Sequence, residues 1–209
     1  SGFSPPLTDG TADLVIASCP SNVASATCSG PARVAVDGAN NLLVADDWNN
    51  RVLRFSRDPV KGWPKTTADF VLGQTAFNQS NQRTGDELDR LRRPVAVRAD
   101  AAGNVYVLEW GDETGNLSRL VKYSGASIAT ALAQGKITVA ATKKLLPRAG
   151  DPAAFLWQPK ALAVDAARGG LWVERTGMAL LVDFATETVT RQIGNGNVGN
   201  FRGLDLDSA

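Results

Sequence analysis

An internal repeat constrains the fold of this chain more than any other feature. Three segments share one order of features: a Pro, an apolar-alternating run that reaches an Asp, a turn with Gly or Asn, and a second apolar run. They are GPARVAVDGANNLLVADD from Gly30, RPVAVRADAAGNVYVLEW from Arg93, and QPKALAVDAARGGLWVER from Gln158, with the shorter NFRGLDLD from Asn200. Repeats of this length predict supersecondary units that bury their apolar faces against one another.

Each unit predicts four short strands. A third strand follows each polar loop, and an outer strand, TADFVLGQ at 67–74, follows the first unit and has an echo in TADLVIAS at 11–18. The third strands are RVLRFS (51–56), SRLVKYS (118–124) and ALLVDFA (179–185). Helical patterns are short and confined to 86–92 and 126–134. The sequence therefore predicts an all-β fold, a β-propeller built of four-stranded antiparallel blades.

The repeat also sets the domain organisation. We expect an N-terminal extension over 1–10 and a propeller segment over 11–209. The blade units cover about 30–74, 93–140 and 158–193, and a further blade starts at 200–207. Propellers close with four to eight blades, and open sheet edges invite pairing. About three blades with flanking strands thus predict part of a larger ring, completed by the rest of the same chain or by another chain.

A family resemblance is carried by the first unit. PARVAVDGANNLLVADDWNNRVLRFS resembles an NHL repeat, and ADFVLGQTAF resembles the outer-strand segment of bacterial extracytoplasmic propellers of that family. The resemblance implies a six-bladed type of ring in the periplasm or outside the cell. It also implies that Asp46, Asn49 and Arg51 brace the turn between the second and third strands. The second unit has Glu109 at the Asp position, and the third lacks the Asn and Arg.

Composition excludes several kinds of site. The chain contains no His, so His-based triads and His-ligated zinc are impossible within these residues. Carboxylates, Lys and calcium remain available for chemistry. With 22 Lys and Arg against 21 Asp and Glu, the net charge is +1, and we expect no nucleic-acid partner. No run approaches the roughly 20 apolar residues of a membrane span.

The two cysteines are Cys19 and Cys28, in a loop rich in Ser, Asn and Ala. Two thiols do not complete a zinc site, so we expect one disulfide and an oxidising compartment. Two free thiols are the alternative.

Strand alternation places the longest loops on one face. In a four-stranded antiparallel blade, the loop between the second and third strands emerges at the same end as the connection to the next blade. Long loops on a rigid scaffold are where binding residues concentrate. The candidate ligand-binding residues on this face are Asp47, Trp48, Trp110, Asp112, Glu113 and Trp157. The alternative for the Trp residues is packing against a neighbouring loop. Arg90, Arg92 and Arg93 form a small basic cluster beside them.

These observations favour a non-catalytic, extracytoplasmic module that binds a protein or a glycan on this face. We assign no catalytic residue, no metal ligand and no cofactor, although Asp47, Asp112, Glu113 and Asp151 could gather around calcium. A lactonase-like hydrolase with a carboxylate-bound divalent metal is the main alternative. The third is an RNA-binding NHL domain that uses the basic cluster.

Overall fold

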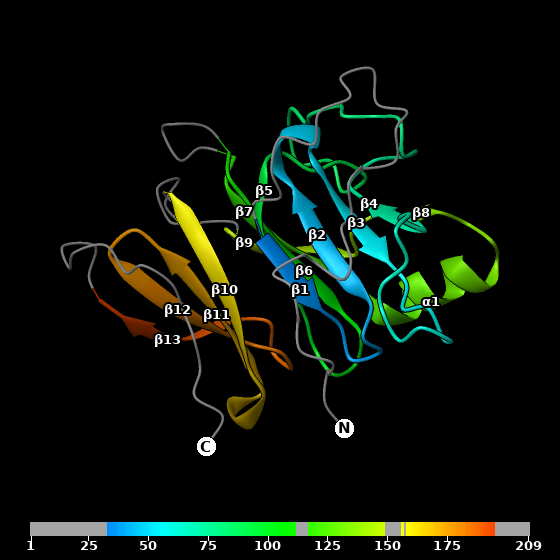
Figure 1. Cartoon of the computed structure of the whole chain (residues 1–209). Coiled ribbons are helices and arrows are strands. Elements are labelled where there is room, and N and C mark those ends of the chain that lie inside the picture. The colour runs from blue at the N-terminus through cyan, green and yellow to red at the C-terminus, as the bar shows by residue number, and fades with distance from the viewer. Residues whose placement is uncertain (1–32, 112–116, 149–155, 157, 195–209) are drawn as a thin grey trace, which may run out of the picture.

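The computed structural model describes residues 33–111, 117–148, 156 and 158–194, and these residues form three antiparallel sheets (Figure 1). Each sheet is a meander of four strands in chain order, and the first sheet also contains one added strand that comes between the third and fourth strands of the second sheet in the sequence. Four antiparallel strands in this order are the blade of a β-propeller, so the predicted fold class is confirmed. Cys19, Cys28 and the strands predicted at 11–18 and 200–207 lie outside the described residues.

The strands of the three blades follow the repeat. The first blade contains β1 (Arg33–Val36), β2 (Leu42–Asp46), β3 (Arg51–Phe55) and β4 (Phe70–Leu72), with the short helix η1 (Asp47–Asn49) between β2 and β3. The second contains β5 (Pro94–Ala99), β6 (Val105–Glu109), β7 (Arg119–Tyr123) and β9 (Lys143–Leu146). The third contains β10 (Pro159–Asp165), η3 (Ala166–Arg168), β11 (Gly170–Arg175), β12 (Met178–Asp183) and β13 (Val189–Ile193).

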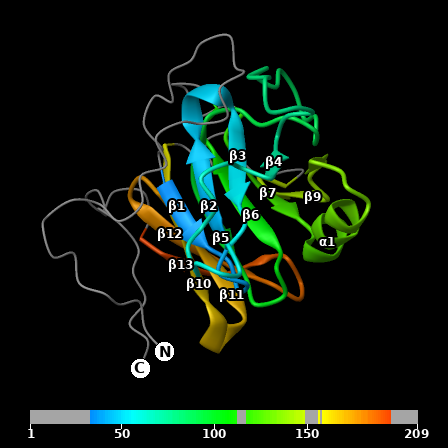
Figure 2. The ribbon, with the colours of Figure 1, turned by 45° about the vertical axis from the view of Figure 1, so that its right-hand side comes forward.

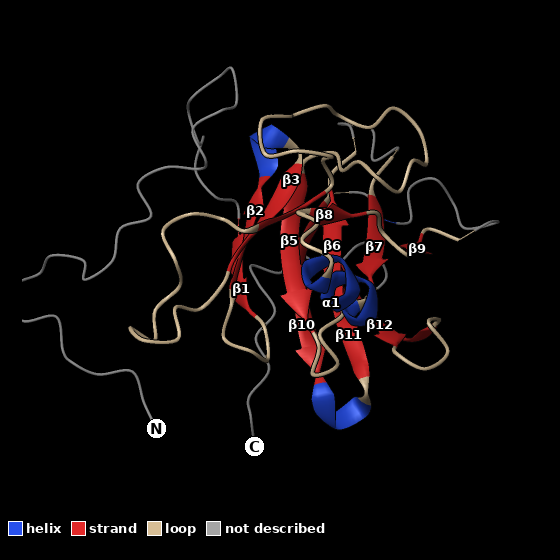
Figure 3. Ribbon diagram, turned by 90° about the vertical axis from the view of Figure 1, so that its right-hand side faces the viewer, coloured by secondary structure: helices blue, strands red, loops and turns tan. Residues whose placement is uncertain are grey.

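One helix and one extra strand interrupt the second blade. The expected helix over 126–134 is present as α1 (Gly125–Ala133), which lies beside the sheets in Figure 2 and in front of them in Figure 3. After α1, the chain forms β8 (Thr138–Val139), which pairs in parallel with β4 of the first blade. The chain then returns to the second blade as β9, so the fourth strand of that blade lies beyond residue 140, where we expected the unit to end. A two-residue strand has too little pattern to be recognised in a sequence.

The helical pattern at 86–92 does not form a helix. Backbone groups of this segment bond to other parts of the chain instead: Leu91 N donates to Gly73 O at 3.2 Å, and Arg119 donates to Glu87 O and Arg90 O at 2.8 Å each. Gly73 has φ 82°, and a Cβ there would lie 2.3 Å from Leu91 Cγ. Tertiary contacts thus hold the segment as a loop over the first two blades.

Two apolar layers join the blades face to face. Leu43 and Ala45 of β2 pack against the side of the second blade that carries Val97 and Val107. The opposite side of the second blade, with Tyr106 and Leu108, packs against the third blade through Leu162, Leu171, Val173 and Leu180. Because both sides of the middle blade are covered, every residue of its second strand β6 is buried.

The third blade differs from the other two in register. The last pair before the first turn is Val36 with Leu42 in the first blade, Ala99 with Val105 in the second, and Asp165 with Gly170 in the third. The third turn is therefore one residue shorter. Because strand side chains alternate with a period of two, this slip turns every side chain of β11 to the opposite face from its sequence counterpart in β2 and β6.

Candidate ligand-binding face

A buried carboxylate braces the turn after β2 in the first blade. Asp46 pairs with Arg51 across the strands, and Arg51 Nε donates to Asp46 Oδ2 at 2.8 Å. Asn49 Nδ2 donates to both Asp46 oxygens at 3.0 and 2.9 Å. Arg51 also donates from Nη1 to Phe77 O, which ties the turn to the following loop. The structure therefore brings together the three residues to which the sequence resemblance gave a bracing role.

The second blade uses the same position with a larger set of partners. Glu109 pairs with Arg119 across the strands, and Glu109 Oε2 accepts from Arg119 Nε and from Arg83 Nε, the latter at 2.9 Å. Glu109 Oε1 accepts from the Arg92 backbone N at 2.8 Å. Burial raises the pKa of the Glu109 carboxyl, while the charges of Arg119 and Arg83 act in the opposite direction. Burial lowers the pKa of Arg83.

Sequence reasoning missed Arg83, which belongs to the long loop at 73–93. Its position follows no repeat, and its partner Glu109 is distant in the chain. Asn50 and Gln74 were missed for the same reason: Asn50 Nδ2 donates to Ser80 O at 3.0 Å, and Gln74 Nε2 donates to Asn50 O at 3.0 Å. Together these contacts fix the loop onto the ends of the first two blades.

The third blade has no such brace among the residues the structure describes. Glu174 has the sequence position of Asp46 and Glu109, but the slip pairs it with Ala161 and Ala179. Both Glu174 carboxylate oxygens are buried without a hydrogen-bond partner, and burial raises the pKa of this carboxyl. Arg175, opposite Met178, takes the place of the carboxylate in the ladder, and burial lowers its pKa.

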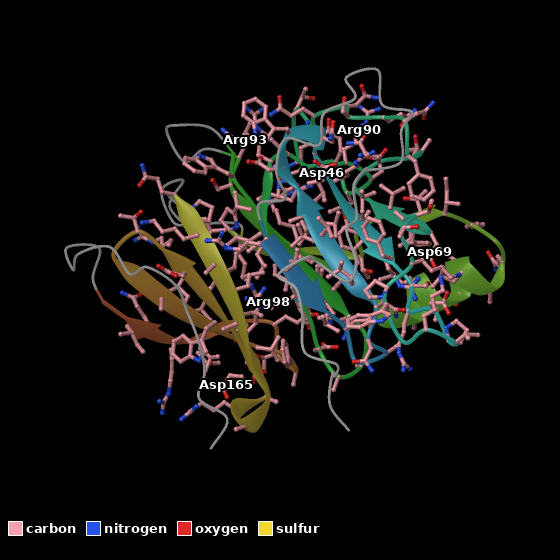
Figure 4. All side chains as sticks on the ribbon, viewed as in Figure 1. Asp46, Asp69, Arg90, Arg93, Arg98 and Asp165 are labelled. Carbon is pink, nitrogen blue, oxygen red and sulfur yellow. The ribbon has the colours of Figure 1, made fainter. Side chains whose placement is uncertain are left out.

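Arg93 connects the turns of the first two blades. Its backbone N donates to Asn50 Oδ1 at 2.9 Å, and its carbonyl accepts from Trp110 N at 2.9 Å. Its Nε donates to Asp47 Oδ1 at 3.3 Å, and its guanidinium lies 5.2 Å from the centre of the Trp110 ring, a cation–π contact. Asp46, Arg90 and Arg93 lie at one end of the sheets, and Asp165 lies at the other (Figure 4).

The predicted ligand-binding residues divide into two groups. Asp47 and Trp110 both contact Arg93, and Trp48 stands between Asp47 and Asn49 with 70% of its surface exposed. Asp112, Glu113 and Trp157 lie outside the described residues, as does Asp151. Within the described ranges, no three His, Cys, Asp or Glu side chains lie close enough to hold a metal ion. No helix in those ranges is long and apolar enough to span a membrane.

The three sheets and the loops fixed on one end of them define a β-propeller with a braced loop face. We use the name loop face for Asp47, Trp48, Arg93 and Trp110 with the loop at 73–93. No family model and no curated protein matches the chain. A solved structure described as "Structure of Dos1 propeller" is similar, with a TM-score of 0.47 and 12% identity over 78% of this chain. The chain covers 36% of that protein's length.

Proposed function

We propose that this chain is a non-catalytic binding module of an NHL-type propeller outside the cytoplasm, and that its protein or glycan ligand lies on the loop face. The exposed Trp48 carries this proposal. A large aromatic side chain left in solvent on a turn fixed on both sides offers contact area at a low entropic cost. Buried bonds from Asp46, Asn49 and Arg51 hold that turn before any ligand arrives.

The experiment compares the wild-type chain with Trp48→Ala and with Lys61→Ala, a matched surface variant in the loop between β3 and β4 at the other end of the blades. Each protein is applied to a glycan array and to an array of extracellular proteins. We expect ligands of the wild type to bind Lys61→Ala equally and Trp48→Ala at least about 10-fold more weakly, the size expected for a hot-spot residue. Equal binding of every ligand by Trp48→Ala would show that the loop face is not the site.

The NHL assignment and the extracytoplasmic location rest on the sequence of the first repeat and on the pair Cys19 and Cys28. Neither the hydrolase nor the RNA-binding alternative gains a specific observation. Of the basic cluster, Arg92 Nε donates to Gly111 O at 2.6 Å and Arg93 is engaged with Asp47. The Nε atoms of both arginines therefore already serve contacts within the chain.

The outer flank of the first blade supports a further partner, another blade of the ring. Val34 and Val36 of β1 are 52% and 57% exposed on this flank. Val34 pairs with Val44, as Val97 pairs with Val107 in the second blade, where both valines are fully buried against the first blade. The position of Val34 is thus exposed in the first blade, and the equivalent position of Val97 is covered in the second blade. We propose that a blade from the rest of the polypeptide or from another chain covers this flank.

Light scattering on the chain tests the second of these sources. A ring completed by a second copy predicts a dimer that Val36→Asp converts to monomers. If both the wild type and Val36→Asp are monomers, the covering blade is assigned to the rest of the polypeptide. Adding that sequence should then protect the β1 amides from hydrogen exchange.

A further inference from the structure

Contacts within the chain hold Arg93 in place without a ligand. Its backbone N and O are bonded to Asn50 and Trp110, its Nε to Asp47, and its guanidinium lies against the Trp110 ring. Four anchors from two blades fix both ends of one side chain. A side chain ordered in advance loses little conformational entropy when it binds, which increases affinity.

The outer edge of the Arg93 guanidinium is unused. No hydrogen bond joins Nη1 or Nη2 to another group in the part of the chain that the structure describes, and the side chain is 44% exposed. The planar fork of a guanidinium matches a carboxylate with two parallel hydrogen bonds. The surface therefore offers one ready position for an anionic group of this shape.

The backbone of Arg93 favours a different residue. Its φ is 43°, in the left-handed region where Gly has no steric cost, and Gly30 precedes Pro31 in the first repeat as Arg93 precedes Pro94 in the second. The equivalent residue of the third repeat, Gln158 before Pro159, has φ 47°, so the left-handed conformation is a feature of the repeat, and the side chain is what distinguishes Arg93.

Trp48 supplies an exposed, flat apolar ring on the same short helix η1 as Asp47, the partner of Arg93. The C–H groups on one side of a sugar ring carry small positive charges and pack on the negative face of an aromatic ring. A standard protein interface needs about 800 Å² from each partner with an apolar centre. Among the described residues of the loop face, Trp48 is the exposed large apolar side chain. One exposed indole ring and one guanidinium form a site of the size of a sugar, which is too small for a protein interface.

We infer that the ligand of the loop face is an acidic glycan, in which a uronic acid ring stacks on Trp48 and its carboxylate pairs with Nη1 and Nη2 of Arg93. The inference rests on the proposed binding function and adds the chemical class of the ligand. The carboxylate replaces solvent at the outer edge of the guanidinium, and Asp47 keeps its bond to Nε. Trp110 stays beneath the guanidinium and holds its plane.

The test is calorimetry with three oligosaccharide probes, made of galacturonic, mannuronic and glucuronic acid, each beside its methyl ester. Esterification removes the charge and leaves the sugar ring unchanged. We expect at least one acid to bind about 10 to 100 times more tightly than its ester, the usual range for a charge-assisted pair. Arg93→Gly should abolish this preference while the protein remains folded, and Arg93→Lys should retain part of it. Trp48→Ala should weaken acid and ester alike.

Each other outcome has a defined meaning. Equal affinity for acid and ester, with both lost in Trp48→Ala, overturns the inference and leaves the proposed binding function standing. If poly-glutamate binds as tightly as the uronic acids, the sugar ring does not contribute to recognition. That result favours a protein partner and also overturns the inference. Failure of all three acids to bind overturns the acidic-glycan class. Lys61→Ala serves as the control and should match the wild type with every probe.

Discussion

Two substitutions at one repeat position should have opposite effects on stability. Glu109 and Glu174 occupy the same place in the second and third repeats, and both side chains are fully buried. Glu109 accepts three hydrogen bonds, two of them from arginine side chains, whereas Glu174 accepts none. We expect Glu109→Met to destabilise the protein and Glu174→Met to stabilise it. Met has a similar length and no charge, so volume changes little in either case.

The sizes follow from what each substitution leaves behind. Glu109→Met leaves the buried Arg83 and Arg119 without their counter-charge, which costs about 3–5 kcal/mol. Glu174→Met removes a buried carboxyl with unsatisfied oxygens beside the apolar Ala163, Trp172 and Leu181, which contributes about 1–3 kcal/mol. For a domain of this size, each kcal/mol shifts Tm by about 2–4 °C.

Urea unfolding at several pH values measures both effects. Burial raises the folded-state pKa of Glu174 above its ordinary value of 4.5, so the folded protein keeps a proton that the unfolded chain has released. Wild-type stability from this group is therefore present below pH 4.5 and is lost as pH rises through the folded pKa. The advantage of Glu174→Met should accordingly grow with pH over that window. Destabilisation by Glu174→Met at pH 7 would refute the reasoning, because it would mean that Glu174 has a partner.

Four further outcomes are expected. Arg51→Ala should lower the free energy of unfolding by about 3–5 kcal/mol in urea, because it strands the buried Asp46 carboxylate; a loss below about 1 kcal/mol would place that pair in solvent. Intact-mass measurement without reductant should find Cys19 and Cys28 joined, and alkylation of both thiols in unreduced protein would contradict this. Calcium and a chelator should leave Tm unchanged; stoichiometric metal with a rise in Tm would instead support the hydrolase. RNA should show no affinity that falls steeply with salt, the behaviour that an RNA-binding face would produce.

Much of the candidate site followed from the repeat itself. The spacing of Asp46, Asn49 and Arg51 placed them on one turn, and strand alternation placed Trp48 and Trp110 at the same end of neighbouring blades. Arg83 and Arg93 became part of the site only in three dimensions. Arg83 reaches Glu109 from a loop without a repeat pattern, and Arg93 contacts groups from two blades. Long-range side-chain contacts of this kind leave no periodic signal in a sequence.

The sequence by itself determined the first three strands of each blade, their order and the blade architecture, because apolar alternation with a period of two and the Gly and Asn turns are local properties of the chain. Tertiary structure decided the rest. It added β8 to the first blade by parallel pairing with β4, and a strand this short cannot be recognised in the sequence. It also decided the position of the third carboxylate, that of Glu174. A turn one residue shorter changed the register, and since neighbouring side chains point to opposite faces, Glu174 was turned away from the place where its counterparts meet their arginines.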